Sequence, residues 1–323
     1  MMVNFPSFEA DLAEASALLP VNVNVAVCIA VRLPNAPVPD LYRLQITDVL
    51  ARKFAQSAID TARELITDIR SGDRTLESYD ASTVTDKHEV EIHEYQPGSV
   101  QEQIGSALSA AAQIQVFPGP GRGRNNLQFY SVTLSRKSDG KSYHFFRRYS
   151  KAKQLSRSGK IYTLFQAGTF DVIEEPLFVF DNYFDSLMLG GKAALVQKDN
   201  YHALFNFFDE LRASAAQTIK TIQDLVPMQN GQAFTDDAKS NPLILMKLRG
   251  IAGRPYVPNL TVDQLEAKII ALGLPLQVVS VSGVKTIVYD PQHKWKLIRL
   301  LDDAFLSSDM TGTNYEAIGK RAI

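Results

Sequence analysis

Two β-rich runs separated by a turn sequence constrain the fold of this chain more than any other feature. Residues 127–137 and 141–149 are rich in Tyr, Val, Thr and Phe, which favour strands, and residues 138–140 (Ser-Asp-Gly) separate them. Asp-Gly is a preferred pair for a two-residue hairpin turn, because both central positions need a positive φ. We therefore predict an antiparallel hairpin with Asp-Gly as its turn and Ser138 opposite Lys141.

Strand alternation assigns the side chains of this hairpin to two faces. One face contains Tyr130, Val132, Leu134, Tyr143 and Phe145. The other contains Ser131, Thr133, Ser135, Lys137, Ser142, His144, Phe146 and Arg148. We expect the first face to be buried. The second should be exposed, polar and basic, with one aromatic ring available to stack on a ligand.

The same region concentrates positive charge. Residues 117–160 carry a net charge of +10, with Asp139 as their one acid, whereas the whole chain carries −1. The basic residues are Arg122, Arg124, Arg136, Lys137, Lys141, Arg147, Arg148, Lys151, Lys153, Arg157 and Lys160. Like charges repel, so such a segment is most stable when a partner or solvent neutralises it. Some of these residues could instead pair with acids such as Glu174, Glu175, Asp181 and Asp185. Surface pairs contribute little, however, and the eleven bases outnumber the five acids of residues 161–191.

We interpret this region as a surface that binds nucleic-acid phosphates, and its charge alone does not distinguish DNA from RNA. The hairpin would position the charge, and residues 150–160, expected to form a mobile basic loop, would supply much of it. Lys and Arg bind phosphates without reading the sequence, so binding should be largely non-specific and steeply dependent on salt. No recognition-helix or zinc-finger pattern is present. Binding of an acidic protein or of anionic lipid headgroups is an alternative use of the same charge.

The sequence predicts a cytoplasmic protein. The longest apolar run, residues 25–31, is far shorter than the ~18 residues that a membrane span needs. The acidic N-terminal sequence lacks the basic and apolar regions of a signal peptide. The chain has a single cysteine, so no internal disulfide can form, which suits a reducing compartment. We expect this residue, Cys28, to be structural, because no local motif supplies a catalytic base.

Neither a cofactor nor a metal site is predicted. The glycines of residues 118–126 lack the strand–helix context of a dinucleotide-binding loop. Residues 190–192 (Gly-Gly-Lys) lack the upstream glycine and the following Ser or Thr of a P-loop. His88 and His93 are five residues apart, so on a strand they would point to opposite faces.

Hydrophobic periodicity predicts several further elements. Alternating valines and isoleucines indicate a strand over residues 21–33. Thr47 can cap a helix that runs through Arg70, and a stripe of apolar residues indicates a long helix over residues 201–226. The expected fold class is α+β, with antiparallel β-sheets and flanking helices.

We divide the sequence into three parts at its clearest change in composition. An N-terminal α+β region covers residues 1–117, and a Gly/Pro/Arg-rich linker covers residues 118–126. The C-terminal domain, residues 127–323, begins with the basic hairpin.

Three segments of the C-terminal half occur in an order that is similar to that of a known family. They are PLFVFDNYFDSLML, KAALVQKDNYHALFNFFDEL and the closing LLDDAFLSSDMTGTNYEAIGK, within residues 165–320. The closing motif contains Asp302, Asp303, Ser307, Thr311, Tyr315 and Lys320. In this order and in the closing motif the chain resembles the KwaB-like family of the Kiwa anti-phage system.

The resemblance implies a function and a set of partners. It implies a cytoplasmic defence protein that binds double-stranded DNA and is held at the inner membrane by a small membrane protein, KwaA. It also implies self-association into a homodimer or a larger assembly.

The acidic pair in the closing motif allows an alternative function. Asp302 and Asp303 could hold Mg²⁺ in a metal-dependent nuclease. We recognise no catalytic motif around them, and adjacent acids at a helix end commonly face solvent or cap the next turn. A non-catalytic DNA-binding protein is therefore the preferred interpretation.

Overall fold

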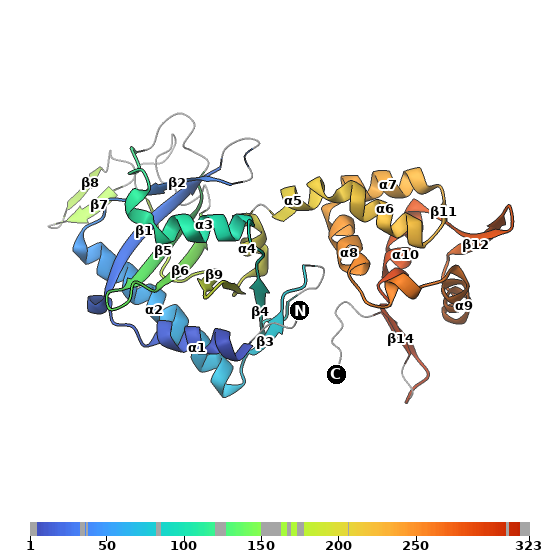
Figure 1. The fold of residues 1–323 in the computed structure, drawn as a ribbon, viewed down its shortest axis with the longest axis horizontal. Coiled ribbons are helices and arrows are strands. Elements are labelled where there is room, and N and C mark those ends of the chain that lie inside the picture. The colour runs from blue at the N-terminus through green and yellow to red at the C-terminus, as the bar shows by residue number, and fades with distance from the viewer. Residues whose placement is uncertain are drawn as a thin grey trace. The chain divides into compact units, whose positions relative to one another are not determined.

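The computed structural model describes residues 5–32, 36, 38–81, 85–119, 127–149, 163–166, 169–172, 178–205, 207–307 and 310–316. The chain divides into two compact units, and both are discontinuous in sequence. Unit 1 consists of Met1–Tyr79 and Thr85–Phe207, and unit 2 consists of Asp80–Val84 and Phe208–Ile323 (Figure 1).

Unit 1 is built on an eight-stranded sheet in the order β2-β1-β5-β6-β9-β10-β4-β3. The strands are β1 (Val23–Val31), β2 (Asp40–Arg43), β3 (Thr75–Ser78), β4 (Glu89–Glu94), β5 (Leu127–Arg136), β6 (Ser142–Arg148), β9 (Ser186–Leu189) and β10 (Lys192–Leu195). Neighbouring strands are antiparallel except β3 and β4, which are parallel. A separate ladder pairs β7 (Thr163–Gln166) with β8 (Thr169–Val172).

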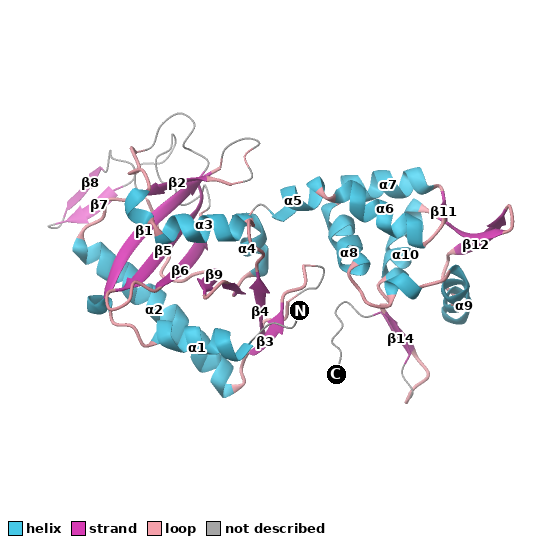
Figure 2. Ribbon diagram, viewed as in Figure 1, coloured by secondary structure: helices cyan, strands magenta, loops and turns pink. Residues whose placement is uncertain are grey.

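Helices cover both faces of this sheet (Figure 2). The helices α1 (Phe5–Ser16) and α2 (Asp48–Ser71) pack on one face, and α3 (Val100–Ser109) and α4 (Lys198–Leu204) pack on the other. Each face therefore has its own apolar core, one centred on Tyr130 and Phe145 and the other on Phe129 and Phe146. The predicted α+β class is confirmed.

The helix α2 shows how local sequence fixes an element. The Thr47 side chain accepts a hydrogen bond from the Leu50 backbone N–H, and Asp48 lies in the positive first turn. Gly72 ends the helix in the left-handed conformation, with φ of 82°. The predicted cap and end are confirmed.

The predicted hairpin forms, but its register differs from the prediction. Ser135 pairs with Ser142 and Leu134 with Tyr143, so the loop spans four residues, 137–140, instead of two. Gly140 has a φ of 74°, and Asp139 does not adopt a positive φ. The physical reason is local, because the Asp139 carboxylate accepts hydrogen bonds from its neighbours and stabilises a wider turn.

The shift of two residues preserves the two faces. Tyr130, Val132, Leu134, Tyr143 and Phe145 are fully buried, as predicted. The prediction that the opposite face is exposed was wrong, since Phe146 is 0% and His144 is 6% exposed. The helices α3 and α4 cover that face, and two pairs of its polar groups bond to each other, Thr133 to His144 at 3.0 Å and Ser135 to Ser142 at 2.8 Å.

Unit 2 is mainly helical. Its helices are α6 (Ala215–Leu225), α7 (Gly231–Ser240), α8 (Pro242–Ala252), α9 (Val262–Leu272) and α10 (Lys294–Leu301). A three-stranded sheet is formed by β11 (Met228–Gln229), β12 (Gln277–Val281) and β13 (Val284–Val288). A two-stranded ladder joins β14 (Phe305–Ser307) to β15 (Asn314–Glu316).

The long helix predicted over residues 201–226 is divided into α4, α5 (Phe207–Ala213) and α6. Leu204 and Phe205 are buried in unit 1, whereas Ile219 and Ile222 are buried in unit 2. The apolar residues of this segment therefore belong to two separate cores, and the segment forms three helices instead of one.

The expected linker at residues 118–126 does not coincide with the division between the units. Val23 pairs with Arg136 and Val31 with Leu127, so segments from both sides of that linker lie next to each other in one sheet. The change of unit falls at Phe207–Phe208 instead.

Candidate functional site

The basic residues of the β5–β6 hairpin divide between its two ends. We call the end with Arg136, Lys137, Asp139 and Lys141 the turn end. The other end, where Leu127 begins β5 and Arg148 ends β6, is the open end. Because β5 and β6 are antiparallel neighbours, Phe129 lies opposite Arg148 there.

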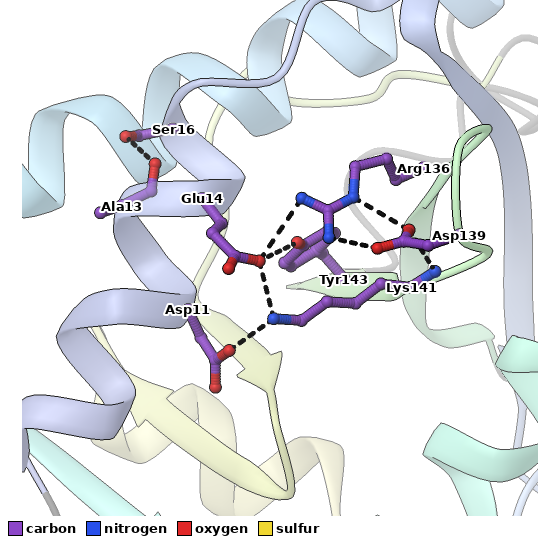
Figure 3. Close-up of polar contacts among 8 residues, drawn as sticks. All are labelled: Asp11, Ala13, Glu14, Ser16, Arg136, Asp139, Lys141 and Tyr143. Carbon is purple, nitrogen blue, oxygen red and sulfur yellow. Dashed lines mark hydrogen bonds and ion pairs between the residues drawn. The ribbon is translucent and has the colours of Figure 1, made fainter.

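At the turn end, helix α1 neutralises the charge (Figure 3). Lys141 Nζ lies 2.7 Å from Asp11 Oδ1 and 2.7 Å from Glu14 Oε2. Arg136 pairs with Asp139 and lies 3.5 Å from Glu14 Oε2. These two cations are therefore engaged with three carboxylates.

The same contacts shift the pKa values of the acids. The hydrogen bonds from Lys141 and Tyr143 lower the pKa of Glu14, and the hydrogen bond from Arg136 lowers the pKa of Asp139 to about 2. Burial and the bond to Glu14 raise the pKa of Tyr143 to about 12. All three groups thus keep their ordinary charge near neutral pH.

Lys137 differs from its neighbours at the turn end. Its Nζ donates to the backbone oxygen of Val21 at 2.8 Å, and its side chain is exposed. Its charge is compensated by a carbonyl dipole and solvent.

At the open end, Arg147 is buried in a polar network. Its side chain is 8% exposed, its Nε donates to Asp181 Oδ2 at 2.6 Å, and its Nη1 donates to Asp185 Oδ1. Its guanidinium carbon lies 4.0 Å from the ring centroid of Tyr183. The predicted alternative of pairing with Asp181 and Asp185 therefore holds for Arg147, which holds the site together instead of facing solvent.

Asp185 anchors this end of the sheet. It is fully buried and accepts the Arg148 backbone N–H at 2.7 Å and the Asn200 side-chain amide at 3.0 Å, besides Arg147. Its backbone oxygen accepts from Val196 and Gln197. Through its carboxylate and its backbone oxygen, this one residue ties together the end of β6, the segment after β10 and the start of α4.

Arg148 is the cation that the open end presents to solvent. Its side chain is exposed, and its Nη1 donates to Asn200 Oδ1 at 3.3 Å. No carboxylate of the described residues pairs with this guanidinium. Arg148 therefore keeps a full charge that an external anion can use.

The other predicted contacts lie outside the described residues. These are Arg122, Arg124, Lys151, Lys153, Arg157 and Lys160, together with the mobile loop expected at residues 150–160. Their sequence position is still informative. The segment 120–126 leads directly into β5, and the segment 150–160 begins two residues after β6 ends, so both connect to the open end.

The two acids of the closing motif, Asp302 and Asp303, form ion pairs with different cations. Asp302 Oδ2 lies 3.7 Å from Lys247 Nζ, and Asp302 Oδ1 lies 3.7 Å from Arg254. Asp303 adopts a φ of 50° and pairs with Lys268 at 2.9 Å. The two carboxylates thus face separate cations within unit 2.

Of the other closing-motif residues, Ser307 ends β14, and Tyr315 lies on β15 opposite Leu306 with its side chain half exposed. Thr311 lies in the turn between these strands. Lys320 is outside the described residues.

Cys28 and the described carboxylates offer no separate chemistry. Cys28 is fully buried, and burial raises the pKa of its thiol to about 12, as a structural residue requires. Across the described parts of the chain, no three His, Cys, Asp or Glu side chains gather closely enough to hold a metal ion. Among the described helices, none has the length and apolar character to cross a bilayer.

Sequence reasoning did not find the acids of α1 or the roles of Tyr183 and Asn200. Lys141 and its partners Asp11 and Glu14 are more than 120 residues apart in the sequence, so no local pattern links them. The one available signal was the concentration of acids between residues 161 and 191, which points to Asp181 and Asp185.

These features define the chain as a two-unit α+β protein with a basic hairpin. Arg136, Lys141 and Arg147 of this hairpin pair with carboxylates, whereas Lys137 and Arg148 are exposed. The sequence model described as "Kiwa protein KwaB-like" matches residues 124–311, which is more than half of the chain. No curated protein and no solved structure matches the chain significantly. The chain belongs to the KwaB-like family of Kiwa proteins. Kiwa is an anti-phage system, so this membership gives the chain a role in anti-phage defence.

The match also extends across the division between the units. It begins just before β5, includes the hairpin, β9, β10 and α4 of unit 1, and continues through α10 and β14 of unit 2.

Proposed function

We propose that this chain is a non-catalytic DNA-binding component of a Kiwa defence system, and that the open end of the β5–β6 hairpin is its contact surface. One observation carries the proposal. Two basic segments that contain no acid, residues 120–126 and 150–160, join the hairpin at the same end as the exposed Arg148. Cations from three parts of the sequence are thereby attached to one place.

The ion pairs of the described basic residues reduce the number of candidate phosphate contacts. Arg136 and Lys141 are compensated by α1, and Arg147 is buried against Asp181 and Asp185. The proposed phosphate contacts are therefore Arg148, Arg122, Arg124, Lys151, Lys153, Arg157 and Lys160. Because these residues bind phosphates, affinity should depend steeply on salt and weakly on sequence.

The direct test compares equal losses of charge at the two ends. Lys151→Gln with Lys153→Gln removes two charges near the open end, and Arg136→Gln with Lys141→Gln removes two at the turn end. Binding of a labelled 20-base-pair duplex is measured by fluorescence anisotropy between 50 and 300 mM salt. We expect the open-end pair to weaken binding at least about tenfold and to reduce the salt slope by about 1–2.

The turn-end pair controls for net charge. Its salt slope should remain that of the unaltered protein. Equal losses in the two variants would show that only the overall charge matters, and an unaltered protein that does not bind the duplex at 50 mM salt would overturn the proposal.

Family membership also supports a membrane partner and self-association. We expect the chain to be recovered with inner membranes when KwaA is co-expressed and to be absent from them otherwise. We further expect light scattering of the pure chain to give the mass of at least two copies. Membrane recovery that is the same without KwaA would contradict the first expectation, and a monomeric mass would contradict the second.

A further inference from the structure

An exposed aromatic side chain lies at the open end of the hairpin, in contact with Arg147. Tyr183 lies between Phe180 and β9, and its side chain is 45% exposed. The Arg147 guanidinium lies over the ring, 4.0 Å from the ring centroid, and its Nη2 donates to the Tyr183 hydroxyl. One face of the ring is therefore covered by a cation, while nearly half of the tyrosine surface is open to solvent.

The contacts with Arg147 favour one orientation of the ring. Arg147 is itself held by Asp181 and by the fully buried Asp185. Turning the ring would break its hydrogen bond and its cation–π contact with this fixed guanidinium. An aromatic ring fixed in this way loses little conformational entropy when a ligand stacks on it.

The same carboxylate also accepts a hydrogen bond from the next residue of β6, Arg148. Asp185 Oδ2 accepts the Arg148 backbone N–H at 2.7 Å, so Arg147 and Arg148 are both fixed by one residue. The Arg148 side chain is exposed and pairs with no carboxylate of the described residues. A flat ring and a free guanidinium are thus organised around a single buried group.

We propose that Tyr183 is a stacking platform for an unpaired nucleobase and that Arg148 binds the adjacent phosphate. This inference rests on the proposed DNA-binding function and names the form of nucleic acid that the open end prefers. Bases in the middle of a duplex already stack on each other, so an aromatic platform is used by single strands and by frayed ends.

The neighbouring Asn200 amide does not recognise the base through hydrogen bonds. Asn200 donates to Asp185 Oδ1 at 3.0 Å and to Gln197 Oε1 at 2.6 Å, and its oxygen accepts from Arg148. With these bonds made, the amide has no free N–H for a base edge. Every base has a flat face, so recognition here should tolerate any sequence.

The test measures binding of a labelled 20-nucleotide single strand and of the matching duplex by fluorescence anisotropy. We expect Tyr183→Leu to weaken single-strand binding at least about fivefold and to change duplex binding less than twofold. Tyr183→Phe keeps the ring and should keep single-strand affinity. Tyr315→Leu removes another exposed tyrosine, 51% exposed in unit 2, and should change neither affinity.

A second measurement uses only the unaltered protein, so its outcome does not depend on whether a variant folds. A single strand containing 2-aminopurine should lose fluorescence on binding to the unaltered protein, because stacking on an aromatic ring quenches the base. Absence of quenching, or equal losses for the two ligands in Tyr183→Leu, would overturn the stacking role while duplex binding still supports the proposed function. If the unaltered protein binds neither ligand, the proposed function itself fails.

Discussion

The two ends of the β5–β6 hairpin carry similar positive charge in the sequence and use it differently in the structure. At the turn end, Lys141 lies 2.7 Å from each of two α1 carboxylates, and Arg136 pairs with Asp139. At the open end, Arg147 is buried against two acids, whereas Arg148 next to it reaches solvent.

This difference shows that a run of basic residues does not by itself define a binding surface. The neighbouring elements decide which cations remain available. Helix α1 brings two acids to the turn end, and residues 181–185 bring two to Arg147. The comparison of the two ends can be tested through stability and affinity together.

The largest effect on folding is expected at Asp185. The substitution Asp185→Ala leaves the Arg147 guanidinium, 8% exposed, short of an anionic partner and deprives the Arg148 N–H and the Asn200 amide of their acceptor. We expect the free energy of unfolding to fall by about 3–5 kcal/mol, measured by urea denaturation. Asp181→Ala serves as the matched variant, since its side chain is 17% exposed and should cost less. A loss below about 1 kcal/mol for Asp185→Ala would show that the open end is not held by this carboxylate.

A smaller effect is expected at the turn end. The substitution Lys141→Gln removes contacts with Asp11 and Glu14, but a third of the lysine side chain is exposed, so solvent screens the pair. We expect a loss of about 1 kcal/mol in urea denaturation and a change in duplex affinity of less than twofold. A large loss of affinity would place the turn end within the binding surface and remove the contrast between the ends.

The turn end should also give a pH dependence. The folded-state pKa of Glu14 is lowered by Lys141 and that of Asp139 is lowered to about 2 by Arg136, both below their unfolded values. Their contribution is therefore fully present above about pH 5 and is lost as the pH falls toward 2. The double variant Glu14→Gln with Asp139→Asn should show a shallower loss of stability over this range.

The control for this pH series is built into the comparison. His144 also destabilises the fold in acid, because burial lowers its pKa to about 4, but it is unchanged in both proteins. The difference between the two titrations therefore reports Glu14 and Asp139 alone. Identical slopes for the two proteins would mean that these pairs do not contribute to stability.

The smallest effect on folding is expected at Arg148, together with a clear effect on binding. The Arg148→Gln substitution breaks one 3.3 Å side-chain bond to Asn200, so the free energy of unfolding should change by less than about 0.5 kcal/mol. The slope of log affinity against log salt should fall by about 1, as expected when one phosphate contact is lost. The matched variant Lys137→Gln removes an exposed charge at the turn end and should leave that slope unchanged. Equal changes of the salt slope in the two variants would show that the two ends do not differ in binding.

Local sequence was sufficient for elements whose causes are local. Thr47 and Gly72 mark the ends of α2, and strand alternation identified the buried face with Tyr143 and Phe145. In the turn between β12 and β13, Ser282 and Gly283 both take a positive φ, as a two-residue hairpin turn requires.

The errors arose where distant or side-chain contacts decide the outcome. Asp-Gly at residues 139–140 predicts a tight turn like that between β12 and β13, but the Asp139 carboxylate accepts hydrogen bonds from Arg136 and from the Lys141 N–H, and the turn is wider. The polar face with Thr133 and His144 looked exposed because alternation does not reveal a second covering layer. That layer comes from α3 and α4, and Thr133 and His144 beneath it bond to each other.

The strand order of unit 1 has a consequence for synthesis on the ribosome. Strand β4 gains its partner β10 only a hundred residues later in the sequence, since His93 pairs with Ala193. At about 5–20 residues per second, the β3–β4 pair waits roughly 5–20 s before its inner edge is covered. Its unpaired backbone groups are open to other chains during that interval. Copies made at the same time would therefore depend on chaperones to keep these edges from pairing with one another until each sheet is complete.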